Sequence, residues 1–174
     1  MRRVRYSVAT SLDGYIAGPS GESDWIIMDP EIDFKALFKS FDTILLGRRT
    51  FELTATQKGP GMPGMRVIVF SRTLRPSDHP KVTIVSEDAG RAVAALRAQE
   101  GKDIWLMGGG GLFRSLLDAG QVDSVEVAVI PVLLGGGIPL LPPPGSRATL
   151  QLAGSKIYSK TGIVSLEYTV QRSA

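Results

Sequence analysis

The chain has 174 residues, 43% of them hydrophobic and 21% charged, a composition typical of one globular domain with a sizeable apolar core. It has no cysteine, which excludes disulfides and thiolate metal sites, and its only histidine, His79, offers no metal cluster. No secretory signal and no apolar run of roughly 20 residues is present, and the net charge of +3 is scattered, so we expect a cytoplasmic protein without a membrane or nucleic-acid partner.

The first part of the chain alternates strands and helices. Alternating or short apolar runs predict strands over residues 4–9, 43–46, 66–70 and 82–85. Apolar residues at helical spacing predict helices over residues 30–41, 48–54 and 89–99, with Pro30 in the first turn of the first helix. Turn residues place loops at 11–24 and 58–64.

The second part begins with a strand over residues 104–107, four glycines and a helix from Leu112. A β-rich run over residues 122–130 follows, and strands over 150–158 and 163–171 form a hairpin. This order predicts a single α/β domain over residues 1–174. We expect a mixed, mostly parallel central sheet with helices on both faces and a C-terminal antiparallel hairpin.

The glycine run from Gly108 to Gly111 predicts a phosphate site. Without Cβ atoms a phosphate can approach the backbone, and the following helix offers free N–H groups and the positive end of its dipole. The spacing fits neither a Walker loop nor a Rossmann fingerprint. The alternative is a plain strand–helix turn, in which each glycine costs about 0.5–1 kcal/mol of backbone entropy.

Two other strand ends predict anion binding. Arg48 and Arg49 begin a helix, where the dipole disfavours cations unless an anion binds there. Ser71 and Arg72 follow a buried strand and suit a phosphate monoester, because arginine offers a planar fork. Solvated arginines and a surface turn are the alternatives. Three such ends favour a nucleotide, since open α/β sheets bind ligands at the carboxyl ends of their strands.

Candidates for substrate chemistry lie near the first helix. Asp29, Glu31 and Asp33 either complement the helix dipole or supply a carboxylate that relays a proton or accepts hydrogen bonds from substrate N–H groups. Asp13 is an Asx-turn residue or a proton donor. Trp25 is a core residue or the wall of a ring-shaped pocket.

Five segments, in this order and spacing, resemble the dihydrofolate reductase fold. More narrowly, they resemble the family that contains the reductase domain of the riboflavin-pathway bifunctional deaminase-reductase. The resemblance implies a three-layer sandwich, NADPH as cofactor and a cis peptide between Gly108 and Gly109. It also implies a homodimer, for which we expect the apolar run 125–134 to pair with itself. The five segments are residues 11–18, 46–52, 69–72, 105–112 and 123–137.

The resemblance also implies which residues contact the cofactor and the substrate. Trp25 and Phe34 are the expected substrate contacts. The cofactor phosphates are expected at Gly47, Arg48, Arg49 and Thr50, the adenosine 2′-phosphate at Ser71 and Arg72, the pyrophosphate and nicotinamide side at Met107, Gly108, Gly109, Gly110, Gly111 and Leu112, and the nicotinamide at Ala9, Ala17 and Gly18.

The sequence departs from a true dihydrofolate reductase at the substrate side. Such enzymes place one carboxylate on the first helix, backed by a threonine on a later strand. Here three acids compete for the carboxylate position, and the matching strand has no threonine, with Val129 nearest the expected place. The zinc ligands of the deaminase half of the riboflavin enzyme are absent as well.

We therefore expect an NADPH-dependent oxidoreductase that acts on a small pyrimidine- or pterin-like heterocycle. The resemblance points to a reductase similar to the 5-amino-6-(5-phosphoribosylamino)uracil reductase of riboflavin biosynthesis. The expected proton donor is Asp13, Glu31, Asp33 or a bound water. A noncatalytic NADPH-binding sensor or scaffold is the alternative.

Overall fold

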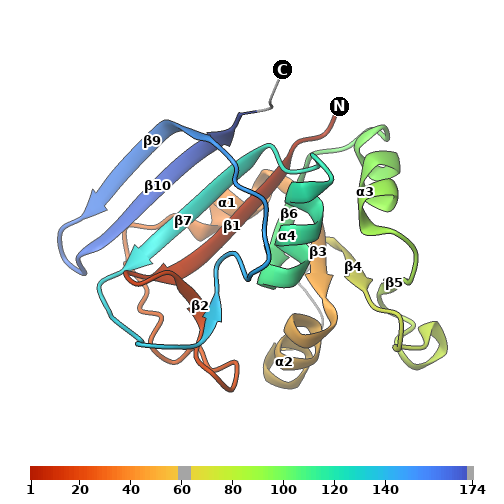
Figure 1. The fold of residues 1–174 in the computed structure, drawn as a ribbon, viewed down its shortest axis with the longest axis horizontal. Coiled ribbons are helices and arrows are strands. Elements are labelled where there is room, and N and C mark those ends of the chain that lie inside the picture. Colours follow the sequence, from red (N-terminus) through yellow and green to blue (C-terminus); the bar gives the residue numbers. More distant parts are fainter. Residues whose placement is uncertain (59–63, 172–174) are drawn as a thin grey trace.

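An eight-stranded sheet forms the centre of the protein (Figure 1). The computed structural model describes residues 1–58 and 64–171. The sheet contains β1 (Val4–Ser11), β3 (Phe41–Gly47), β4 (Arg66–Phe70), β5 (Thr83–Val85), β6 (Asp103–Gly108), β7 (Ser124–Ile130), β9 (Leu150–Tyr158) and β10 (Ile163–Val170), and a separate ribbon pairs β2 (Tyr15–Ala17) with β8 (Ile138–Pro139).

The strand order of the large sheet is β5-β4-β3-β6-β1-β7-β10-β9. The strands from β5 to β7 are mutually parallel, whereas β10 runs antiparallel to both β7 and β9. The predicted mixed sheet with a C-terminal antiparallel hairpin is therefore confirmed.

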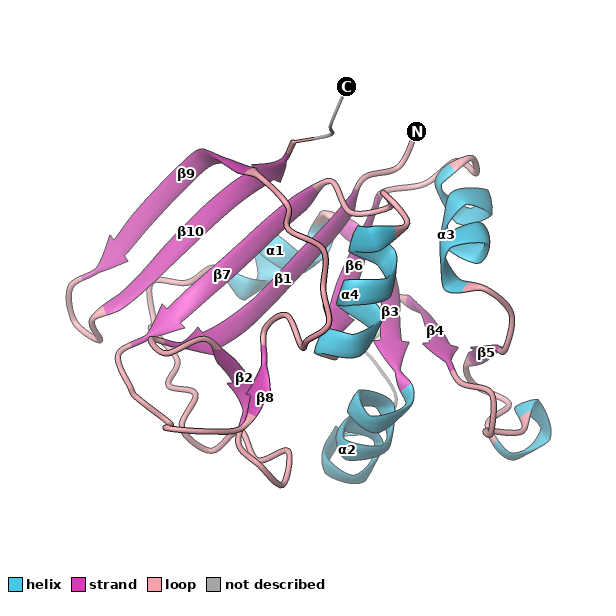
Figure 2. Ribbon diagram, viewed as in Figure 1, coloured by secondary structure: helices cyan, strands magenta, loops and turns pink. Residues whose placement is uncertain are grey.

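Helices cover both faces of this sheet (Figure 2). On one face, α3 (Ala89–Arg97) and α4 (Gly110–Asp118) pack through residues such as Val93 and Phe113 against the buried side chains of β1 and β6. On the other face, α1 (Phe34–Lys39) and α2 (Arg48–Lys58) pack through residues such as Phe38 and Phe51 against β3 and β6. The expected three-layer sandwich is confirmed. None of the helices in the described residues has the length and apolar character that crossing a membrane requires.

The first helix is shorter than the sequence predicts. It begins at Phe34 instead of Pro30, because the Asp33 carboxylate accepts a hydrogen bond from the N–H of Ala36 (2.8 Å) and caps the helix there. Phe41 belongs to β3, where its buried ring stacks on Trp105 at 5.8 Å. Side-chain capping and aromatic packing thus override the helical spacing at both ends.

The strand β7 lies in the interior of the sheet. It is paired with β1 along one edge and with β10 along the other. A strand with both edges occupied cannot pair edge to edge with its copy, so the predicted self-pairing of residues 125–134 is wrong for 125–130, the part that lies in β7, while a homodimer itself stays a prediction. The predicted loop at 58–64 falls mainly on residues 59–63, which lie outside the described part of the chain, and α2 continues past the expected end at residue 54.

Candidate active site

The three predicted anion-binding segments meet at one edge of the sheet. They follow β4, β3 and β6, which are neighbours and run in parallel, so their carboxyl ends lie side by side. In the register, Gly47 pairs with Phe70, next to Ser71, and Leu46 pairs with Gly108. The fold therefore brings together three segments that are far apart in the sequence.

A long groove, which we call the glycine groove, runs along this edge. Its main part has a volume of about 880 Å³ and a second part has about 610 Å³. Both parts are lined by Gly47, Gly111 and Leu112, so they adjoin at these residues. The predicted cofactor residues on the main part are Ala9, Ala17, Gly47, Arg48, Arg49, Thr50, Met107, Gly109, Gly110, Gly111 and Leu112, whereas Gly18 and Gly108 are not among its lining residues.

The N-terminus of α4 opens onto the groove. Gly109 is the N-cap and provides no side-chain cap, and the first N–H bonded back to it is that of Phe113 (3.1 Å). The first N–H groups of the helix are thus available to an anion. A Cβ on Gly110 would lie 2.7 Å from the carbonyl oxygen of Pro139, whereas a Cβ on Gly111 would meet open space. The predicted cis peptide between Gly108 and Gly109 is present.

Three arginines, Arg48, Arg49 and Arg114, line the main part of the groove, and no carboxylate is among its lining residues in the described chain. Arg48 pairs with Glu52 (2.7 Å) and donates to the hydroxyl of Thr73 (2.8 Å). Arg114 donates to a backbone carbonyl at 3.1 Å. This cationic wall, together with the helix N-terminus, suits the phosphates of a dinucleotide.

The second part of the groove has a mixed charge. Ser71 and Arg72 line it as expected, but Glu87 and Asp88 line it too. The Ser71 hydroxyl accepts from the N–H of Leu74 (3.0 Å), and Asp88 caps α3 through the N–H of Arg91 (2.9 Å). A phosphate here would meet one guanidinium and the carboxylate of Glu87, a residue that the sequence analysis did not single out.

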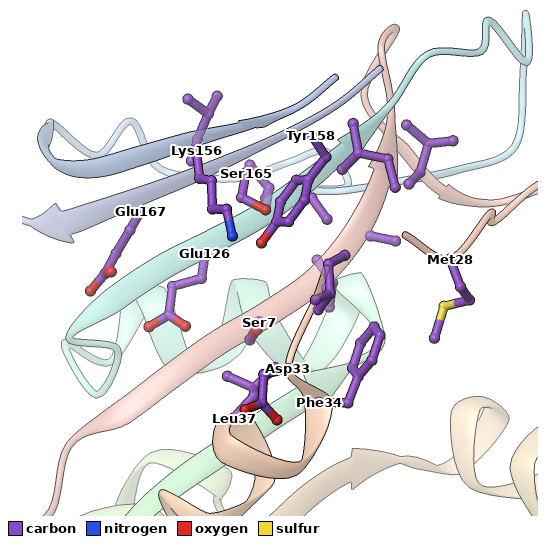
Figure 3. A pocket seen from close by; sticks show the side chains of 18 of the residues that line it. Ser7, Met28, Asp33, Phe34, Leu37, Glu126, Lys156, Tyr158, Ser165 and Glu167 are labelled. Carbon is purple, nitrogen blue, oxygen red and sulfur yellow. The ribbon is translucent and has the colours of Figure 1, made fainter. Parts of the chain in front are cut away.

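A further cavity of about 600 Å³ adjoins the glycine groove (Figure 3). We call it the acidic cavity. It lies between the sheet and the segment 26–38, and shares Ala9 and Trp105 with the groove. Phe34, which we expected to contact a substrate, lines it. Trp105 donates from its indole N–H to the carbonyl of Ser7 (2.9 Å) and stacks on Phe38 at 5.3 Å.

An ion pair forms part of the polar wall of the acidic cavity. Arg5 on β1 binds Glu126 on β7 with two bonds, from Nε to Oε1 (2.7 Å) and from Nη2 to Oε2 (2.8 Å). The side chains are 16% and 12% exposed. The hydrogen bond with Glu126 raises the pKa of Arg5, although burial opposes this shift. Neither residue is among the site residues predicted from the sequence, although a lone glutamate in an apolar strand is a usable signal.

The structure separates the four predicted acids. Asp33 lines the acidic cavity, whereas Asp13, Asp29 and Glu31 are not among the residues that line the three spaces described. Asp29 is buried and accepts a bond from the hydroxyl of Thr161 (2.7 Å), which lowers the pKa of Asp29. Glu31 pairs with Lys160 at 3.2 Å.

Asp13 connects two loops. It accepts hydrogen bonds from the hydroxyl of Ser11 (2.7 Å) and from the backbone N–H groups of Leu134 (3.1 Å) and Gly135 (2.8 Å). These bonds, with that of Ser11 the largest, lower the pKa of Asp13. The geometry therefore gives Asp13 a structural contact.

Two other expectations change with the structure. Trp25 packs against the cluster of Ile130, Tyr158 and Ile163, and is not among the residues that line the acidic cavity. Val129 packs on the opposite face of the sheet, the face of α3 and α4. The side chains of β7 that face the cavity are those of Glu126, Ala128 and Ile130, because successive residues of a strand point to opposite faces.

The chain matches the family model of the RibD C-terminal domain over residues 2–164. The Bacillus subtilis (strain 168) protein YyaP is 33% identical over 96% of this chain and 94% of its own length. The structure of a proposed riboflavin biosynthesis protein from Shewanella sp. PV-4 superposes with a TM-score of 0.82, at 27% identity, over 99% of this chain and 100% of that one.

A more distant likeness concerns the fold alone. Dihydrofolate reductase from Enterococcus faecalis, solved in complex with NADP(H), superposes with a TM-score of 0.72 at 18% identity, over 98% of this chain and 97% of that one. The family match and the arrangement of the sheet agree. The chain belongs to the RibD C-terminal domain family and has the dihydrofolate reductase fold.

Proposed function

We propose that this protein is an NADPH-dependent reductase of a small, planar heterocycle. The observation that carries the proposal is the glycine groove, which adjoins the acidic cavity at Ala9 and Trp105. The groove offers free helix N–H groups and three arginines, and the cavity offers aromatic walls of the size of a single ring system. An anionic cofactor and a planar substrate would meet where the two spaces join.

The residues of the groove fit the cofactor in separate ways. Arg48 and Arg49 would bind its phosphates, and the N-terminus of α4 would face its pyrophosphate. Arg72 would meet the 2′-phosphate. When bound, NADPH supplies a hydride to an electrophilic C=N or C=O carbon. Ile26 and Phe34, which line the cavity, would exclude water from the reacting atoms.

Asp33 is the proposed proton donor among the acids of the sequence analysis. It is the one of them that lines the acidic cavity, on the side opposite the sheet (Figure 3). Its Oδ1 caps α1, and its other oxygen has no partner in the described chain, so it can meet a substrate atom directly or through a water.

The test is the affinity for the two nicotinamide cofactors, measured by fluorescence titration. We expect NADPH to bind more tightly than NADH, and Arg72→Ala to remove most of this preference, about tenfold, because the 2′-phosphate loses its guanidinium. The matched control is Arg75→Ala, which removes a nearby arginine that does not line the groove. An unchanged preference in Arg72→Ala contradicts the 2′-phosphate assignment.

A noncatalytic NADPH-binding protein is the second candidate. It is favoured by the engagement of Asp13, Asp29 and Glu31 in structural contacts outside the cavity. The two candidates differ in one measurement. A reductase oxidises NADPH when a panel of pyrimidines and pterins is added, and loses this activity in Asp33→Asn, whereas a sensor binds NADPH without oxidising it.

A further inference from the structure

The acidic cavity carries more negative than positive charge. Five charged residues of the described chain line it, the carboxylates of Asp33, Glu126 and Glu167 and the cations of Arg5 and Lys156. A substrate that enters the cavity meets these five charged groups. The charge that it can carry there depends on which of the groups are not already paired within the protein.

Four of the five N–H groups of the Arg5 guanidinium are used within the described part of the protein. Its Nε and Nη2 bind Glu126, and its Nη1 reaches Ser40 (3.2 Å) and Asp103 (3.4 Å). The group also lies over the ring of Phe41, at 4.7 Å. All three nitrogens of Arg5 have protein partners, and two carboxylates surround them. Arg5 therefore has no free pair of parallel N–H groups with which to bind a substrate phosphate.

Glu126 keeps capacity for a further hydrogen bond. Its Oε1 accepts from Arg5 and from the hydroxyl of Ser124 (2.8 Å), whereas its Oε2 accepts from Arg5 alone in the described chain. A carboxylate oxygen can accept two hydrogen bonds. The Glu126 side chain lies on the wall of the cavity beside Ser7, its neighbour in the parallel pairing of β7 with β1 (Figure 3).

A second glutamate strengthens the negative potential of this wall. Glu167 on β10 is directly opposite Glu126 in the antiparallel register, an arrangement of like charges that is unfavourable in a sheet. Lys156, the remaining cation, places its Nζ 4.5 Å above the ring of Tyr158 and points toward Glu126 in Figure 3. A phosphate that approached Lys156 would therefore meet the two glutamates.

We infer that the acidic cavity takes an unphosphorylated planar ring, neutral or cationic, and that Glu126 selects it by accepting a hydrogen bond from an amino or ring N–H group of the substrate. The ring packs against Phe34 and Trp105. This inference rests on the proposed function for its place in catalysis. It separates the substrate of this protein from phosphoribosylated pyrimidines, because their phosphate finds no free guanidinium on this wall.

The first experiment compares ligands of matched shape by isothermal titration calorimetry with the protein saturated with NADPH. The probes are 2,4-diaminopyrimidine, uracil and orotate, which are cationic on protonation, neutral and anionic. We expect the diaminopyrimidine to bind most tightly, since a hydrogen bond to a charged group is worth about 1.5–3 kcal/mol, and orotate at least about tenfold more weakly, because the carboxylates of the cavity repel its own carboxylate. An orotate affinity equal to or above that of the diaminopyrimidine overturns the inference.

The second experiment asks about phosphate directly. Uridine and uridine 5′-monophosphate differ only in this group. We expect the monophosphate to bind more weakly than uridine, and tighter binding of the monophosphate overturns the inference.

The third experiment tests Glu126 itself. We expect Glu126→Gln to weaken the cationic 2,4-diaminopyrimidine about tenfold and uracil by less than about threefold, because the ring N–H of uracil is an uncharged donor and its hydrogen bond to the carboxylate is weaker, with NADPH affinity unchanged. Glu167→Gln is the matched control, the same substitution at an exposed position on the neighbouring strand β10, and we expect a smaller loss. Equal losses in the two variants contradict the role of Glu126. If Glu126→Gln does not fold, the relative affinities of the unmodified protein for 2,4-diaminopyrimidine, uracil and orotate decide whether the inference holds.

The inference and the proposed function fail in different ways. If NADPH does not bind, the proposed function is wrong, and the ligand order is then measured without cofactor. If NADPH binds and is oxidised but uridine 5′-monophosphate is the better ligand, the proposed function stands and the inference alone is wrong.

Discussion

The glycine groove and the acidic cavity adjoin at Ala9 and Trp105 but differ in charge and in construction. Among the described residues, the main groove is lined by three arginines and no carboxylate, and the cavity by three carboxylates and two cations. The groove is lined by several glycines and by the N-terminus of α4 besides its arginines, whereas the cavity is lined by side chains from several strands. Opposite potentials in adjoining spaces favour an anion in one space and disfavour it in the other. The charges of the two spaces therefore favour an anionic ligand in the groove and a neutral or cationic ligand in the cavity.

The largest expected effect concerns the ion pair that supports the cavity wall. Glu126→Ala leaves the half-buried Arg5 without its two-bond partner, and we expect a loss of about 3 kcal/mol in the free energy of unfolding. Urea denaturation measures this loss. The double change Arg5→Met with Glu126→Leu removes both charges, and we expect it to recover much of the loss. A single variant as stable as the unmodified protein contradicts the energetic importance of the pair.

The next effect tests the groove side of the comparison. Gly111→Asp places a carboxylate at the N-terminus of α4, where a Cβ meets open space, so the fold is kept while the bound phosphates are repelled. We expect NADPH affinity to fall about a hundredfold in a fluorescence titration. Gly111→Ala is the control and we expect a much smaller loss. Equal losses in both variants would mean that the space, and not the charge, is what the cofactor needs.

A smaller effect concerns the mixed charge at the far end of the groove. Glu87 lines this end together with Arg72. We expect Glu87→Gln to raise NADPH affinity about threefold and to leave NADH affinity nearly unchanged, because the carboxylate opposes only the 2′-phosphate. The ratio of the two dissociation constants measures the effect at low salt. A rise for both cofactors would place the influence of Glu87 elsewhere than at the 2′-phosphate.

The two spaces also differ in how far the sequence predicts them. The groove could be predicted because each of its parts is local: a strand end, glycines or arginines, and the start of a helix are contiguous in the chain. The acidic cavity could not be predicted from the sequence, since Arg5 and Glu126 are 121 residues apart and meet only because β1 pairs with β7. The start of α1 at Phe34, after the N-cap Asp33, could not be predicted for another reason. Three nearby acids and Pro30 all suit a helix N-terminus, and packing selects among them.

The smallest expected effect depends on pH and concerns the attachment of the cavity wall. Asp29 joins the segment before α1 to Thr161 in the turn between β9 and β10. The hydroxyl of Thr161 lowers the pKa of Asp29, so the contribution of Asp29 to stability is present above the ordinary aspartate pKa of about 3.9 and is lost as the pH falls through the lowered value.

Asp29→Asn tests this attachment. We expect the variant to melt below the unmodified protein by a constant amount between about pH 5 and pH 7, and the difference to shrink below about pH 4 as the carboxylate takes up a proton. Thermal melts across this range measure it, with Glu31→Gln as a control in the same segment at an exposed ion pair. If the difference persists undiminished at low pH, the charge of Asp29 is not what holds the segment. The wall of the acidic cavity would then depend on the packing of Ile26 and Ile32 against the sheet, which is independent of pH.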